Sequence, residues 1–309
     1  MIRRPPRSTQ GVSSAASDVY KRQVRVGSDE RSFTVDSNWE KLPSGWEAPM
    51  AAVAVDSRDR VYGFNRGPNK VIIFDKEGNY LDHWKDSDFI FPHAIYADHA
   101  DNIWIVDRDA GQVLKYTPEG ELLLSIGEKG YRSDTGADNS VFTSDGFKDV
   151  THAGEPFNLP AGVAVAPSGD VFVADGYANC RVHRFDSQGN HILSWGEPGN
   201  GEGQFMLPHG VSIASDGTVL VSDRENDRIQ AFDQTGNFLS EWATDLIGPA
   251  LVWQDSVGQG FVPEHNGGNF SVLSSEGGRI ARWGDEQYIS CHGAACLLYT
   301  SPSPRDGLL

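Results

Sequence analysis

One repeated pattern limits what this chain can fold into more than any other feature. Its clearest copy, residues 159–196, contains four short apolar runs (GVAVA, VFVAD, RVHRF and HILSW), each bounded by Gly, Asn, Asp or Ser. Residues 207–243 repeat this pattern. A unit of four strands cannot bury both of its faces alone, and repeats of about 40–45 residues with four strands each are typical of propeller blades.

Five copies of the unit follow one another along the chain. The first, second and fifth copies cover residues 49–84, 91–127 and 248–284. An acidic or amide residue ends the second strand of every copy: Asn65, Asp107, Asp175, Asp223 and Glu264. A sixth copy starts at ISCHGAA (289–295) and is cut off. The sequence therefore predicts an all-β, six-bladed propeller, recorded as about five blades and a truncated sixth.

The two ends of the chain differ from the rest. Residues 1–23 and 296–309 lack the strand pattern and resemble translated sequencing-adapter sequence, so we expect foreign tails there. The remaining residues, 24–295, are predicted to form one propeller domain with a long insert loop at 128–157, rich in Gly, Asp, Ser and Thr. The lead-in at 31–46 is expected to add an outer strand to the last blade and so remove a free edge.

The composition excludes several classes of function. A formal net charge of −17 argues against a surface for nucleic acid or anionic membranes, and no apolar run is long enough to span a bilayer. Cysteines at 180, 291 and 296 do not have the spacing of a disulfide framework. We expect a monomer that binds a small molecule or peptide.

The repeat also predicts where a ligand binds. Because strands alternate in direction within a blade, the start of strand one and the end of strand two lie at the same mouth of the ring. His93, His209 and His292 open strand one in the same frame, on alternate blades. A single histidine at such a position is more often just hydrogen-bonded, but three around one cavity suit zinc. Except for His265, the remaining histidines, at positions 83, 99, 152, 183 and 191, are interpreted as surface residues.

Cationic and aromatic residues follow strand two at the same mouth. Arg66, Arg108 and Arg224 either form structural ion pairs or bind a carboxylate in a bidentate manner. Tyr177 is either a packed aromatic or a base, and His265 is either a further metal ligand or a substrate contact. The runs Asp175 to Arg181 and Asp223 to Arg228 are expected to brace the blades.

At this point the residues carry a family resemblance. The Asp-x-x-Asn-x-Arg-Ile/Val and Phe-Asp-x-x-Gly runs resemble NHL-repeat propellers. Over roughly residues 47–295 the chain more closely resembles the peptidyl-α-hydroxyglycine α-amidating lyases. The most specific segments are VADGYANCRV (173–182), GQFMLPH (203–209) and DRENDRIQ (223–230).

The resemblance implies a mechanism and a set of roles. In that family a six-bladed propeller holds zinc through three histidines, here His93, His209 and His292. Tyr177 is implied as the catalytic base, and Arg66 and Arg224 as the pair that binds the substrate carboxylate. The reaction splits a C-terminal α-hydroxyglycine into a peptide amide and glyoxylate. The family also favours an extracellular or periplasmic location.

Two departures from the family pattern concern its structural calcium and a disulfide. The family has an Asp after its third histidine, where this chain has Gly293, although the backbone carbonyl of Ile95 remains a candidate calcium ligand. Cys180 lies one residue away from the family's bridged cysteine, so we expect no bridge.

Two other functions are compatible with a propeller. One is a non-catalytic NHL propeller that binds protein or carbohydrate, which would require no metal. The other is a metal-dependent, lactonase-like hydrolase, which would need a centre rich in carboxylates rather than in His and Arg.

Overall fold

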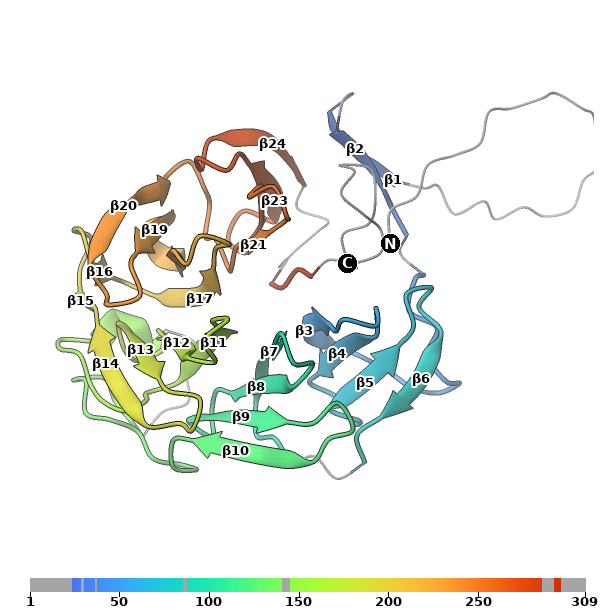
Figure 1. Ribbon diagram of the computed structural model, residues 1–309, viewed down its shortest axis with the longest axis horizontal. Helices are drawn as coiled ribbons and strands as arrows, with labels where there is room; N and C mark the ends of the chain where they lie inside the picture. The colour runs from blue at the N-terminus through green and yellow to red at the C-terminus, as the bar shows by residue number, and fades with distance from the viewer. Residues whose placement is uncertain are drawn as a thin grey trace, which may run out of the picture.

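The fold is built from five four-stranded antiparallel sheets arranged around a common axis (Figure 1). This computed structural model describes residues 24–28, 31–36, 38–85, 88–140, 145–284 and 292–295, so the predicted tails and residues 289–291 lie outside the described residues. Blade one consists of β3 (Met50–Val55), β4 (Val61–Asn65), β5 (Val71–Phe74) and β6 (Tyr80–His83). Blade two consists of β7 (Pro92–Ala97), β8 (Ile103–Asp107), β9 (Gln112–Tyr116) and β10 (Leu122–Ile126). Blade three consists of β11 (Pro160–Val165), β12 (Val171–Asp175), β13 (Arg181–Phe185) and β14 (His191–Trp195).

The fourth and fifth blades continue the same order. They consist of β17 (Pro208–Ile213), β18 (Val219–Asp223), β19 (Arg228–Phe232) and β20 (Phe238–Ala243), and of β21 (Trp253–Gln254), β22 (Gly260–Glu264), β23 (Asn269–Leu273) and β24 (Arg279–Gly284). Two short strands, β15 (Glu197–Pro198) and β16 (Gln204–Phe205), pair in parallel between blades three and four. The all-β prediction and the five blade boundaries are therefore confirmed.

The third turn of the blades explains the Phe-Asp-x-x-Gly run. In blade four, Asp233 accepts hydrogen bonds from the main-chain N–H of Thr235 (2.8 Å) and Asn237 (3.0 Å), and from the Asn237 amide (2.8 Å). Gly236 supplies the positive φ of 83° that closes the turn, a conformation that costs glycine little. The sequence thus specifies the hairpin between strands three and four locally.

The strand register agrees with the predicted topology, in which the start of strand one lies beside the end of strand two. In blades one to four the first residue of the inner strand pairs with the last residue of strand two, as in Pro92 with Asp107 and Pro208 with Asp223. Figure 1 shows the inner strands β3, β7, β11 and β17 around the axis and the outer strands β6, β10, β14 and β20 at the rim. Since side chains of adjacent blades interdigitate, the core forms between the sheets, with Trp104 and Phe172 among the largest fully buried side chains.

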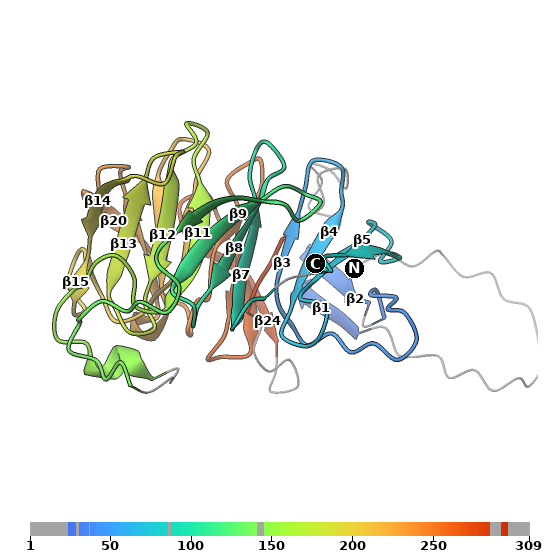
Figure 2. The ribbon, with the colours of Figure 1, turned by 90° about the horizontal axis from the view of Figure 1, so that it is seen from below.

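Helical structure is confined to two short 3₁₀ turns in the described residues, η1 (Gly146–Asp149) and η2 (Arg224–Asn226). None of the helices in that part of the chain is long and apolar enough to cross a membrane. The described residues of the 128–157 insert contain η1 but no strand, and η1 lies at one face of the ring (Figure 2). Thr135 fixes the insert to blade three by donating a hydrogen bond to the Ala178 carbonyl at 2.7 Å.

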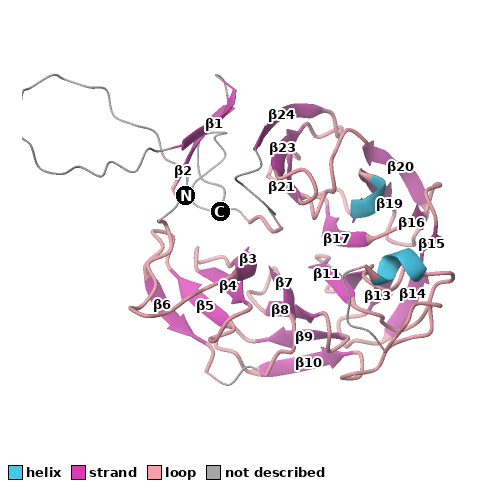
Figure 3. Cartoon of the chain, turned by 180° about the vertical axis from the view of Figure 1, so that it is seen from behind, coloured by secondary structure: helices cyan, strands magenta, loops and turns pink. Residues whose placement is uncertain are grey.

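The expectation for the lead-in is wrong in part. Its strand β2 (Arg31–Val35) pairs with β1 (Val24–Ser28) in a separate two-stranded sheet rather than with a strand of another blade. This hairpin lies between β24 and blade one (Figures 1 and 3), and Phe33 packs on Phe261 and Val272 of blade five. The later lead-in residues pack on blade one instead, because Trp39 reaches the apolar face of its outer strands and donates to the Lys76 carbonyl at 3.2 Å.

Candidate functional site

The three histidines predicted from the repeat come together on the propeller axis. His93 lies on β7 and His209 on β17, while His292 belongs to the short described segment 292–295. Their ring centroids are 5.0 Å (His93–His209), 4.8 Å (His93–His292) and 4.7 Å (His209–His292) apart. One ring nitrogen from each lies within 4.8 Å of the others, which is compatible with a shared ligand.

Main-chain carbonyls determine which nitrogen of each ring carries the proton. Nδ1 of His93 lies 2.6 Å from the Ala161 carbonyl oxygen, and Nδ1 of His209 lies 2.7 Å from that of Ala250. Nδ1 of His292 lies 3.1 Å from the Ala51 carbonyl. Because a carbonyl oxygen only accepts, each Nδ1 donates and each Nε2 keeps a lone pair. Hydrogen bonds of this kind orient metal-binding histidines and fix their tautomer.

The hydrogen-bond count at the centre leaves lone pairs unsatisfied. The Tyr177 hydroxyl lies 3.1 Å from Nε2 of His93 and 3.1 Å from Nε2 of His209. A phenol has one hydrogen, so it can donate to only one of them. Nε2 of His292 is buried and has no partner among the described residues. In the described part of the chain, the three Nε2 lone pairs thus have only the Tyr177 hydroxyl hydrogen to share. This arrangement fits a divalent cation such as zinc, because three imidazoles can bind the ion and leave one coordination position open.

The electrostatics keep the three rings neutral. Burial lowers the pKa of His93 and His209 well below the ordinary value, and the neighbouring His292 adds to the effect. Burial, assisted by His265, Arg66 and Arg224, lowers the pKa of His292 to about 3. Neutral imidazole is the form that binds a metal ion.

A cavity of about 440 Å³ lies next to the histidines and contains the other predicted site residues. Its lining consists of Arg66, Phe91, Arg108, Asp145, Phe147, Lys148, Tyr177, Arg224, Glu225, His265, Asn266 and His292. The cavity wall therefore includes three of the residues predicted at this mouth, namely Arg66, Arg108 and His265. Phe147 and Lys148 come from the insert, and neither was predicted because a loop sequence does not show where it docks.

The three arginines in this cavity have different partners. Arg224 pairs with Glu225 at 2.8 Å and donates to the Tyr177 oxygen at 3.1 Å. Arg108 pairs with Asp109 at 2.7 Å. In the described part of the chain no carboxylate lies within 4.0 Å of Arg66, whose guanidinium stacks on the Phe91 ring at 4.6 Å. Burial lowers the pKa of Arg66, and an ion pair with a carboxylate ligand would offset the cost of burying its charge.

His265 adds a second imidazole to the wall of the cavity. Its ring centroid lies 5.7 Å from that of His292, and its Nδ1 is buried with no hydrogen-bond partner among the described residues. Burial, assisted by Arg224, lowers its pKa. The atom is therefore available to a bound molecule.

A second cavity of about 330 Å³ runs along the inner strands and is also lined by the three histidines. Ile95 borders it, two residues after His93 on β7, together with Gly293 and Val163. No described carboxylate lines this channel, so a calcium ion there would depend on main-chain oxygens.

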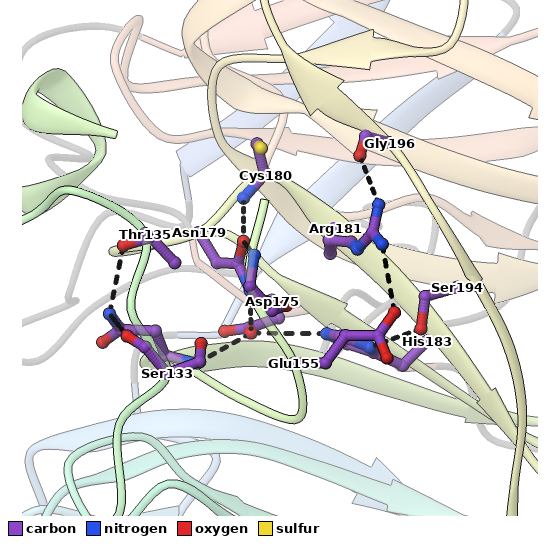
Figure 4. A network of polar contacts seen from close by, with 12 residues as sticks. Ser133, Thr135, Glu155, Asp175, Asn179, Cys180, Arg181, His183, Ser194 and Gly196 are labelled. Carbon is purple, nitrogen blue, oxygen red and sulfur yellow. Dashed lines mark hydrogen bonds and ion pairs between the residues drawn. The ribbon is translucent and has the colours of Figure 1, made fainter. Parts of the chain in front are cut away.

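The interpretation of His183 as a surface residue is wrong. Its side chain on β13 is fully buried, because Phe157 from the end of the insert packs on it with ring centroids 5.3 Å apart, and Asp175 lies behind it. Of the two predicted braces, Arg228 binds Asp223 at 3.1 Å. Arg181 instead donates to the Gly196 carbonyl at 3.0 Å (Figure 4).

Comparison with known proteins supports the repeat assignment. The NHL repeat family matches residues 157–185 and 205–232, which fall in blades three and four. The chain is an NHL-repeat β-propeller. It is similar to human NHL repeat-containing protein 3, with 30% identity over 68% of this chain and 59% of that protein.

Amidating lyases are also among the relatives of this propeller. Peptidyl-alpha-hydroxyglycine alpha-amidating lyase 1 of Drosophila melanogaster is 32% identical over 54% of this chain and 30% of its own length. This chain therefore spans less than two thirds of the length of each of these two relatives. Among solved structures, a streptogramin B lyase superposes with a TM-score of 0.58 over 82% of this chain and 75% of its own, at 14% identity, which shows the fold alone.

Proposed function

We propose that this propeller is a zinc-dependent carbon–nitrogen lyase of the peptidyl-α-hydroxyglycine amidating type. His93, His209 and His292 would hold the zinc through Nε2, with the substrate in the adjoining 440 Å³ cavity. The observation that carries the proposal is the position of Tyr177, whose hydroxyl lies 3.1 Å from Nε2 of two of these histidines and 3.1 Å from Arg224. Zinc would supply a Lewis acid that polarises the substrate hydroxyl.

The side chains of the cavity account for the other parts of the reaction. Arg66, which lacks a carboxylate partner among the described residues, binds the terminal carboxylate of the substrate. Tyr177 acts as the base that accepts the proton of the α-hydroxyl group, and Arg224, which donates to the phenolic oxygen at 3.1 Å, stabilises the charge that develops there. As the hydroxyl oxygen forms a carbonyl, the C–N bond breaks and its electron pair passes to nitrogen. The nitrogen takes up the proton that Tyr177 accepted, which yields the amide and glyoxylate and regenerates the base.

Other features belong to the same proposal. Arg108 and His265, which both line the cavity, would contact the substrate. A calcium ion in the axial channel would use the main-chain carbonyl of Ile95. The substrate is a peptide or small molecule with a terminal carboxylate, the working unit is a monomer with a sixth blade that closes the ring, and the location is extracellular or periplasmic.

The test is metal content combined with activity. Full-length protein should contain about one tightly bound zinc in the central site and release glyoxylate from peptides ending in α-hydroxyglycine. The double variant His93→Ala/His209→Ala should lose that zinc and the activity while retaining its β-sheet circular dichroism. No central zinc in the unmodified protein would contradict the lyase and leave a non-catalytic propeller that binds protein or carbohydrate.

A further inference from the structure

A second group of potential metal ligands lies on the outer strands of blade three, away from the histidines of the inner strands. It consists of Glu155 at the end of the insert, His183 on β13 and His191 on β14. One donor atom from each lies within 4.8 Å of the others. Neither the catalytic proposal nor the NHL repeat pattern assigns a role to this group.

His183 is held in the orientation expected of a metal ligand. Its Nε2 lies 3.4 Å from the buried carboxylate of Asp175 (Figure 4). A carboxylate accepts, so Nε2 carries the hydrogen and Nδ1 keeps its lone pair. A buried carboxylate behind an imidazole is a recurrent second layer around zinc, where it fixes the tautomer and raises the basicity of the ligating nitrogen.

The hydroxyl of Ser194 lies between Nδ1 of His183 and the other two potential ligands, His191 and Glu155. Ser194 Oγ lies 2.8 Å from Nδ1 of His183 and 2.7 Å from Nε2 of His191. Burial opposes the ionisation of Glu155, but hydrogen bonds from Arg181 and then from Ser194 lower the pKa of its carboxyl overall. Two imidazoles and a carboxylate therefore converge on the small volume around the Ser194 oxygen.

The local charge favours a cation. Three carboxylates are linked to this group: Glu155 belongs to it, Asp175 lies 3.4 Å from His183, and Glu197 shares Arg181 with Glu155. Arg181 is the basic side chain that pairs with two of them, at 3.0 Å from Glu155 and 3.3 Å from Glu197. The excess of negative charge, together with two imidazoles, matches a divalent transition metal better than an anion or an alkali ion.

We propose that Glu155, His183 and His191 form a second metal site for Zn²⁺ or a similar dication. Water or the Ser194 hydroxyl completes the coordination. The metal joins the end of the insert to β13 and β14. Since Asp175 also accepts from the Asn179 amide at 2.8 Å, the metal would stabilise the loop that carries Tyr177. The site is structural and does not depend on the catalytic proposal.

Zinc titration of the metal-stripped, full-length protein tests this site. Calorimetry should detect an outer equivalent in addition to any bound at the centre, and Co²⁺ should give the visible absorption of a low-symmetry site. His191 is exposed, so His191→Gln should leave the fold intact while weakening the outer equivalent by at least about 100-fold. The matched control is His152→Gln, an exposed histidine of the insert outside both groups, which should bind as the unmodified protein does.

The two metal sites can be distinguished by their variants. The outer equivalent should persist in the His93→Ala/His209→Ala protein and weaken in Glu155→Gln, whichever way the central site behaves. A wild-type protein that binds no metal outside the central histidines would overturn the proposal. The same holds if His191→Gln and Glu155→Gln both retain the outer equivalent at full affinity. Ser194 would then simply link these groups by hydrogen bonds.

Discussion

Replacing Tyr177 with Phe removes one oxygen atom from the centre of the candidate site. The ring is 4% exposed, and it stacks under Arg108 at 4.8 Å and Arg224 at 5.3 Å. Phenylalanine keeps the shape of the ring and most of this packing. We therefore expect Tyr177→Phe to fold and to lose about 1 kcal/mol of stability at most, the net value of a typical hydrogen bond.

The effect on catalysis should be far larger. The hydroxyl lies 3.1 Å from Arg224 Nη1 and 3.1 Å from Nε2 of two histidines, where a base would meet a substrate hydroxyl. A positioned base contributes about 10²–10⁴-fold to the rate, so kcat should fall by that factor, or roughly 3–5 kcal/mol of transition-state stabilisation. Zinc content should stay the same, since the ligating nitrogens are untouched.

The assay is glyoxylate release from a peptide ending in α-hydroxyglycine, with metal analysis of the same samples. Tyr131→Phe is the matched control because Tyr131 is 45% exposed in the insert, and it should retain full activity. A Tyr177→Phe protein with native zinc content and a kcat within threefold of wild type would refute the role of Tyr177 as base. Loss of zinc in this variant would show instead that the tyrosine supports the metal.

Three further predictions concern substrate binding, acid stability and packing. Arg66→Ala should raise KM for an α-hydroxyglycine peptide by about 10–100-fold through loss of a charged hydrogen bond, whereas an unchanged KM would place the carboxylate elsewhere. In the metal-free protein the pKa of His292 is about 3 when folded and 6.5 when unfolded, so the unfolded state binds more protons. Stability should be full above pH 6.5 and fall towards pH 3, with His292 alone contributing up to ~1.4 kcal/mol per pH unit and the buried His93 and His209 adding to the loss. Urea melts that are flat between pH 7 and 5 would contradict this. Gly176→Ala should lower stability by about 1–3 kcal/mol in thermal melts, since a Cβ there meets the Pro208 carbonyl oxygen at 2.4 Å. Gly278→Ala, where the nearest atom is 3.4 Å away, is the control and should melt as wild type does.

Much of the site followed from the repeat because a repeat converts sequence position into position in space. His93 and His209 open the inner strand of blades two and four in the same frame, and the ring closure brings equivalent positions to the axis. The same reasoning placed Arg66 and Arg224 after strand two, at the mouth that Tyr177 shares. Local turn chemistry, such as that of Asp233, determined the hairpin between strands three and four of a blade.

Other features depend on contacts between segments that no periodic pattern relates. The repeat does not encode where the insert docks, so neither the burial of His183 under Phe157 nor the place of Phe147 in the cavity could be predicted. The lead-in (31–46) was predicted to join the last blade because ring closure needs an outer strand. In the structure Trp39 packs on apolar side chains of blade one instead.

The sequence by itself determined the blades and the residues that face the axis, because strand alternation and turn residues act over a few neighbouring positions. Only the tertiary structure decided the chemistry of those residues. The tautomer of His93 depends on the Ala161 carbonyl, which comes from the inner strand of the next blade. The hydrogen shortage around Tyr177 likewise arises only where three blades meet, since each histidine alone could have found a separate donor.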